Sequence, residues 1–144
     1  MTDPRPTEAT NEERATLRTV RQALMSLHKL LLDHERARFE HENGRIETTH
    51  QHLKLVIEHP SFAWLRPLSG LIARFDERLN GKEPLSAADA RQLATDARAL
   101  TTFAEERTEY QQHYHRALED DPDILAAHAS VARSLAPFLA RTSR

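Results

Sequence analysis

The chain has 144 residues, of which 39% are hydrophobic and 29% charged, and its formal net charge is −2. This length fits one domain that can bury a real core without disulfides or metal. The absence of cysteine excludes disulfides, zinc–thiolate sites and cysteine nucleophiles. A near-neutral charge gives no basic footprint, so no nucleic-acid partner is expected.

Targeting and catalytic motifs are missing from the sequence. The N-terminus has no apolar core, and no apolar run approaches the roughly 18 residues of a membrane span. Only three glycines occur, and no phosphate-binding loop, nucleophile elbow, H-E-x-x-H or EF-hand pattern is present. We therefore expect a cytoplasmic, non-membrane protein, and the absence of these motifs favours a protein that is not an enzyme. The sequence does not indicate a cofactor.

The first predicted element is a long helix. Residues 1–9 are polar and proline-bearing and are expected to form a disordered tail before a single domain over 10–144. Thr10 opens T-N-E-E, a capping box with Glu13 that starts a helix over 11–42. Its apolar stripe is Leu17, Val20, Leu24, Leu27, Leu31 and Phe39. Asn43 and Gly44 form a stop signal.

Two shorter helices follow, with a break between them. The first is predicted over 46–59, ends at Pro60, and has Ile46, Leu53, Val56 and Ile57 as its apolar residues. The second is predicted over 67–79, with Leu68, Ile72, Phe75 and Leu79 inward. Between the two prolines that bound the break, Phe62 and Trp64 are expected to fill it.

The last two predicted helices begin at clear caps. Ser86 caps a helix that is expected to run to Leu118, with Asp89 at the capping-box position. Asp121 caps the final helix, and Pro122 stands at its first position. No strand pattern appears in the sequence.

The helix lengths predict an all-α, antiparallel four-helix bundle with its second helix broken at Pro60–Pro67, which gives five helical segments. The two long helices and the broken pair have similar lengths, and short connections favour up-down-up-down topology. In an alternative arrangement, the two halves of the broken helix fold back as a hairpin.

Polar residues interrupt the apolar stripes of this predicted bundle. They are His28, Glu35, His50, Arg107 and His128. Even helical rise places them at a similar level of the bundle, together with Tyr110 and Tyr114. A buried unpaired charge is unfavourable by several kcal/mol, so Glu35 is expected to pair with Arg107.

Three interpretations of this polar layer stay open. It is a structural network, a ligand pocket between helices, or a metal site. The predicted ligand-binding residues are His28, Glu35, Arg66, Arg107, Tyr110 and Tyr114. The predicted metal ligands are His50, His128 and Glu35, although E-T-T-H supplies only half of a di-iron pattern.

Two further residue groups belong to these predictions. Arg66 either caps carbonyls at the end of the preceding helix or contacts an anion. Six histidines outside the apolar stripes are expected to be exposed. They are His34, His41, His52, His59, His113 and His115.

Three stretches resemble a group of small bacterial all-helical proteins with no assigned activity. They are L-H-K-L-L-L-D-H-E-R, F-A-W-L-R-P-L-S-G-L-I-A-R-F-D-E and D-P-D-I-L-A-A-H. The resemblance covers roughly residues 20–135 and matches His28, Lys29, Glu35, Arg36, Trp64, Arg66, Pro67, Asp76, Glu77 and His128. It implies a bacterial, cytoplasmic protein and brings no activity with it.

The sequence therefore favours a non-catalytic binding or interaction module, with a homodimer through a long helix face as one form. The alternative is a bundle that binds a small molecule or a metal ion in its polar layer. The partner is accordingly a second copy, another protein or a small anionic ligand.

Overall fold

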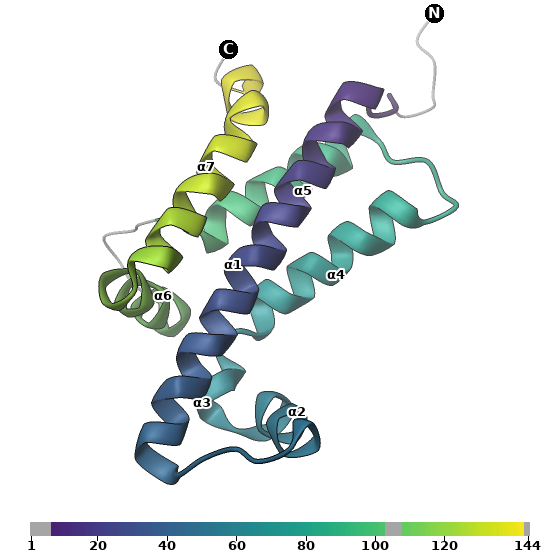
Figure 1. Cartoon of the computed structure of the whole chain (residues 1–144). Helices are drawn as coiled ribbons and strands as arrows, with labels where there is room; N and C mark the ends of the chain where they lie inside the picture. The colour runs from purple at the N-terminus through teal and green to yellow at the C-terminus, as the bar shows by residue number, and fades with distance from the viewer. Residues whose placement is uncertain (1–6, 103–107, 143–144) are drawn as a thin grey trace, which may run out of the picture.

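A computed structural model describes residues 7–102 and 108–142, and these residues form seven helices and no strand (Figure 1). The helices are α1 Asn11–Asn43, α2 Thr49–Glu58, α3 Pro60–Ala63, α4 Arg66–Asn80, α5 Ala87–Leu100, α6 Glu109–Asp120 and α7 Pro122–Thr142. The all-α prediction is confirmed, but the described residues divide into seven helices instead of five segments.

Helix α1 begins and ends at the signals found in the sequence. The hydroxyl of Thr10 accepts from the amide of Glu13 at 3.0 Å, and the Glu13 carboxylate accepts from the amide of Thr10 at 2.9 Å. Gly44 stops the helix in the left-handed region, with φ of 91°. Both ends use local interactions, which explains why the sequence predicts them to within one residue.

Helix α1 is the centre of the fold. It lies between α7 and α4, while α5 lies behind and contacts all three (Figure 1). Helix α6 packs on α7, and α2 packs mainly on the short α3 at the far end of α1. This arrangement does not confirm the predicted up-down-up-down bundle, because α2 turns away from the body of the molecule.

The hydrophobic core forms around the inward stripe of α1. Leu17, Val20, Leu24, Leu27 and Leu31 are fully buried there, as the sequence predicted. They pack against buried side chains of the neighbouring helices, among them Leu68, Phe75, Ala90, Ala97, Ile124, Val131 and Leu135. Phe39, the last residue of the predicted stripe, is only half-buried.

The prediction of one helix from 86 to 118 is wrong. Helix α5 ends at Leu100, and α6 begins at Glu109. Thr108 caps α6 through a capping box with Gln111, in which each side chain accepts from the other residue's backbone amide. This T-x-x-Q signal starts α6, which buries Tyr114 and Leu118 of the predicted stripe and also His115 and Ala117.

The break between the second and third predicted helices is present. Helix α2 starts at Thr49, because Thr48 and Gln51 form another capping box, and Ile46 therefore lies in the preceding loop. Helix α3 fills part of the break, and α4 begins at Arg66. Phe62 and Trp64 are 1% and 6% exposed, so they fill the break as expected.

The predicted N-terminal tail is only partly described. Residues 1–6 lie outside the described part of the chain. Residues 7–9 instead pair with the segment before α5: the amide of Ala9 donates to the carbonyl of Leu85 at 2.8 Å, and that of Ala87 to Thr7 at 2.8 Å. Among the described residues, no helix is long and apolar enough to cross a membrane.

Candidate functional site

A series of aromatic rings connects the α3–α4 turn to α7 through α6. The ring of Trp64 meets Tyr110 edge-on at 5.5 Å between centroids. Tyr110 stacks on Tyr114 at 5.9 Å, one helical turn further along α6. The Tyr114 hydroxyl lies 2.7 Å from Nδ1 of His128 on α7. Of the polar layer predicted from the sequence, the structure therefore brings Tyr110, Tyr114 and His128 together.

Burial keeps these groups in their uncharged forms. Burial raises the pKa of Tyr114 far above its usual value, and the neighbouring Tyr110 raises it further. Burial lowers the pKa of His128, with a smaller contribution from His115. A protonated hydroxyl and a neutral imidazole thus share this hydrogen bond. Tyr110, whose pKa burial also raises, donates to the carbonyl of Leu100 at 2.9 Å.

One further residue, His113, joins this cluster. His113 stacks on Trp64 at 5.2 Å between centroids and at 15° between planes. Neither Trp64 Nε1 nor His113 Nδ1 has a hydrogen-bond partner within the described ranges. These ring contacts join α6 to the α3–α4 turn mainly by packing. Of the three interpretations of the polar layer, this favours the structural network.

The expected exposure of six histidines is wrong for most of them. His115 is only 2% exposed, while His34, His52, His59 and His113 are half-buried. His115 is buried on α6 beside Tyr114 and Leu118. His34 lies 3.6 Å from the carboxylate of Asp120, so it connects α1 to the end of α6.

Glu35 is a buried carboxylate with a partner on its own helix. It is 3% exposed, and the Arg38 guanidinium lies 3.5 Å from it, one turn further along α1. The partner predicted from the sequence, Arg107, lies outside the described residues. Glu35 and Arg38 are three residues apart on α1, so they can pair whatever packs against this helix.

The predicted metal ligands lie on three helices and do not form a site. Glu35 is on α1, His128 on α7, and His50 is exposed on α2. Within the described ranges, no three histidine, cysteine or acidic side chains form a group that could hold a metal ion.

The remaining predicted ligand residues are His28 and Arg66. Arg66 donates to the carbonyl of Ile57 near the end of α2, which is the capping role offered by the sequence. His28 is half-buried on α1, and burial lowers its pKa. It lines a groove of about 410 Å³ between α1 and α4 together with Leu32 and Ile72.

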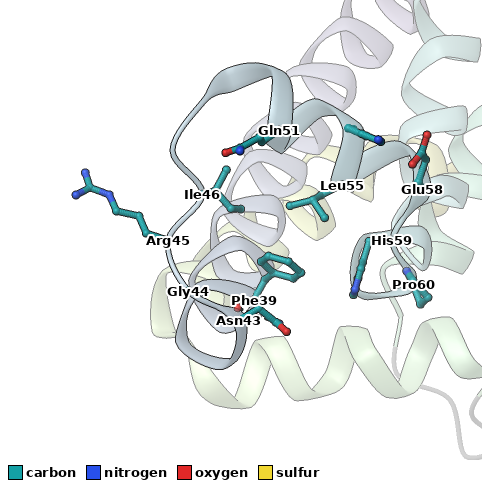
Figure 2. A pocket seen from close by; sticks show the side chains of 11 residues that line it. Phe39, Asn43, Gly44, Arg45, Ile46, Gln51, Leu55, Glu58, His59 and Pro60 are labelled. Atoms are coloured by element: carbon teal, nitrogen blue, oxygen red, sulfur yellow. Dashed lines mark hydrogen bonds between the residues drawn. The ribbon is translucent and has the colours of Figure 1, made fainter.

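Another pocket lies at the other end of α1, where α1 meets α2. It has a volume of about 540 Å³ and opens to solvent. Figure 2 shows Phe39, Leu55 and His59 around its centre, while Arg45 points away from it. The full lining is Phe39, Asn43, Gly44, Arg45, Ile46, Gln51, Lys54, Leu55, Glu58, His59 and Pro60.

The wall of this pocket is held by the loop between α1 and α2. Ile46, which is 4% exposed, donates its amide to the Glu40 carboxylate at 2.8 Å. Arg36 donates to the Ile46 carbonyl at 3.4 Å and pairs with Glu40 at 3.3 Å. The bond from the Ile46 amide, and then the Arg36 charge, hold the pKa of Glu40 below its usual value.

Aromatic contacts form the floor of the pocket. The rings of Phe39 and His59 meet edge-on at 5.1 Å, and Phe62 lies behind Phe39 at 6.0 Å. His52 meets Phe62 at 6.0 Å and thus joins α2 to this floor. The floor is therefore preformed from α1, α2 and α3.

Helix α2 is apolar on more sides than its neighbours cover. Leu55 faces the pocket, whereas Leu53 and Ile57, which belong to the apolar pattern of the predicted helix, are each 57% exposed. None of its residues is buried. The sequence carried a sign of this surface, since Leu53, Leu55, Val56 and Ile57 are too closely spaced to share one face of a helix.

Comparisons with known proteins give no match: no family model, no curated protein and no solved structure matches this chain. The resemblance to small bacterial proteins accordingly stays a prediction. The pockets and surfaces of the molecule itself are therefore the basis for inferring its function.

Proposed function

We propose that this protein is a non-catalytic protein-binding module, and that its site is the α1–α2 pocket together with the exposed side chains of Leu53 and Ile57. The observation that carries this proposal is that α2 bears apolar side chains on more than one side. Leu55 lines the pocket, and Leu53 and Ile57, one turn apart on another side of the helix, are exposed to solvent. Large exposed apolar patches on a monomer mark binding sites.

An amphipathic helix of another protein is the occupant that this surface fits best. Leu53 and Ile57 are four residues apart, so they lie one above the other and can pack against a helix with the same spacing. A small molecule confined to the pocket would leave both side chains in water. Lys54 and Arg45 at the rim favour acidic residues beside the apolar face of the partner helix.

The polar groups of the pocket support binding instead of catalysis. Nδ1 of His59 accepts from the amide of Ser61 at 3.1 Å. The Gln51 side chain accepts from the amides of Glu47 and Thr48 at 3.0 and 3.2 Å. These side chains cap the N-termini of α2 and α3. Their polar atoms are therefore engaged by backbone amides, and the pocket offers a partner mainly van der Waals contacts.

The test uses a designed 18-residue amphipathic peptide that has leucines at helical spacing and glutamates on its other face. A control peptide has the same composition in scrambled order. Titration followed by amide chemical shifts should move residues around Phe39, Ile46 and Leu55, with a micromolar Kd. Leu53→Asp should weaken binding about tenfold, because a carboxylate replaces a contacting apolar side chain.

The matched control is Leu125→Asp on α7, since Leu125 is 48% exposed at a distant position. It should leave peptide affinity unchanged. The proposal is overturned if the amphipathic peptide moves no residue of the pocket, or if both leucine variants have the same effect. Saturable binding of a fatty acid or an apolar dye in the pocket, without peptide binding, would also overturn it in favour of a small-molecule site.

A further inference from the structure

A second surface lies on α1 itself, on the side that no other described helix covers. Helices α7 and α4 flank α1, and α5 lies behind it, so the side toward the viewer in Figure 1 is open. The exposed residues recur every three or four positions along this side. They are Arg18, Gln22, Met25, Ser26, Lys29 and Asp33.

Grooves run along both edges of this open side. The α1–α4 groove, about 410 Å³, is lined by the apolar side chains of Met25, Leu32 and Ile72 among others. The α1–α7 groove is about 290 Å³. Gln22 and Ser26 line both grooves and therefore form the ridge between them. A ridge between two grooves is the shape that packs against another helix.

The charges along the ridge are complementary to those of a second α1 helix that runs antiparallel to the first. Arg18 and Asp33 stand at equal distances on either side of the Met25–Ser26 midpoint. They lie about 22 Å apart along the helix axis, so they cannot meet within one copy. In an antiparallel pair of α1 helices centred on that midpoint, Arg18 lies opposite the partner's Asp33, and the reverse pair repeats the contact.

The other opposed positions are compatible with this register. Met25 lies opposite the partner's Ser26, and Lys29 lies opposite the partner's Gln22, so no like charges face each other. Lys29 already pairs with Asp33 at 3.0 Å within one copy. A carboxylate has two oxygens and can accept from both this lysine and an arginine of the second copy.

We infer that the protein forms a homodimer in which the two α1 helices pack antiparallel across a two-fold axis at Met25–Ser26. Such an interface is self-complementary, as a two-fold interface must be. Helix α1 and its neighbours α4 and α7, spaced about 9 Å apart, offer a contact area of roughly 600 Å² per copy over about 22 Å of the helix axis. This area is near the low end for specific dimers, so a micromolar Kd is expected.

This dimer would place the two α1–α2 pockets at opposite ends. Phe39 and the partner's Phe39 would lie about 40 Å apart along the paired helices. Such a dimer could bind two partner helices at once, one in each pocket. Only this consequence rests on the proposed function. The dimer test uses no peptide, and the peptide test needs no dimer, so either proposal can fail without the other.

Sedimentation equilibrium of the full chain tests the dimer and its register. Arg18→Glu and Asp33→Arg should each weaken dimerisation about tenfold, because each places two pairs of like charges across the axis. The double variant should restore the wild-type Kd. Arg91→Glu, which makes the same charge change at an exposed position of α5, should have no effect.

Crosslinking provides a second measurement that does not depend on charge. The chain has no cysteine, so Ser26→Cys introduces one thiol beside the proposed axis. A short bismaleimide should link this variant into dimers, whereas Ala99→Cys on α5 should stay unlinked. A wild-type chain that stays monomeric at its highest soluble concentration would overturn the inference. So would a dimer that the double charge exchange fails to restore, or equal crosslinking of both thiols.

Discussion

His128 lies inside the fold, where its Nδ1 shares a hydrogen bond with the Tyr114 hydroxyl, 2.7 Å away. A second histidine, His28, is half-buried between α1 and α4. In both cases burial is the main cause of a lowered pKa in the folded chain. These residues therefore make folding sensitive to mild acid.

We predict that the free energy of unfolding falls below the ordinary histidine pKa of 6.5. Above pH 6.5 both rings are neutral in the folded and unfolded chains, so their full contribution is present. As the pH falls toward the lowered folded-state pKa, the unfolded chain binds protons first and stability is lost. Urea unfolding between pH 5 and 8 measures this slope, with the pH values chosen to bracket the transition.

The variants of this experiment separate buried from surface histidines. His128→Asn should reduce the slope of stability against pH, because it removes one group whose pKa differs between the two states. His41→Asn changes an exposed histidine and should leave the slope as in the wild type. Equal slopes in all three proteins would contradict the assignment to His128.

At the scale of elements, the helix boundaries follow capping boxes. Thr10 with Glu13, Thr48 with Gln51, and Thr108 with Gln111 each bond reciprocally through side chains and backbone amides. The box at Thr48 explains why α2 begins later than the apolar pattern predicts, and the box at Thr108 starts α6 within a stretch that was predicted to be one continuous helix. Helix α2 depends most on its box, because it has no buried residue.

We predict that Thr48→Ala destabilises α2 by about 1 kcal/mol, the usual effect of losing an N-cap. Amide hydrogen exchange should quicken in α2 and in the wall of the α1–α2 pocket, while the amides of α1 and α7 keep their protection. Thr49→Ala is the matched control, since Thr49 is the exposed neighbour within the first turn. An equal effect of both variants would show that the cap does not matter.

At the scale of the whole molecule, stability is concentrated around α1. This helix contacts α7, α4, α5 and α3, and Leu24 at its middle is fully buried. Helix α2 packs mainly on α3 and leaves Leu53 largely exposed. The core and the candidate binding surface are thus separate parts of the molecule, so binding variants need not unfold it.

Two leucine truncations should distinguish these parts. Leu24→Ala should lower the free energy of unfolding by about 3 kcal/mol, because it removes a fully buried side chain and leaves a cavity. Leu53→Ala should change it by less than about 0.5 kcal/mol. Urea denaturation with far-ultraviolet circular dichroism measures both. Similar losses in the two variants would mean that α2 belongs to the cooperative core.

Sequence by itself determined the helical class, the bounds of α1 and its inward leucine stripe. These features are local, because capping groups, glycine stops and apolar spacing act within a few residues of the chain. The starts of α2 and α6 are also encoded locally, by the T-x-x-Q capping boxes at Thr48 and Thr108.

Only the tertiary structure decided which faces are covered. Leu53 and Ile57 follow an apolar pattern but stay exposed, whereas His115 looks like a surface residue and is buried. Tyr110, Tyr114 and His128 meet as the helical levels suggested, but Glu35 pairs within its own helix and His50 lies apart on α2. Burial depends on neighbours distant in sequence, and no periodicity within one helix specifies how the other helices pack around it.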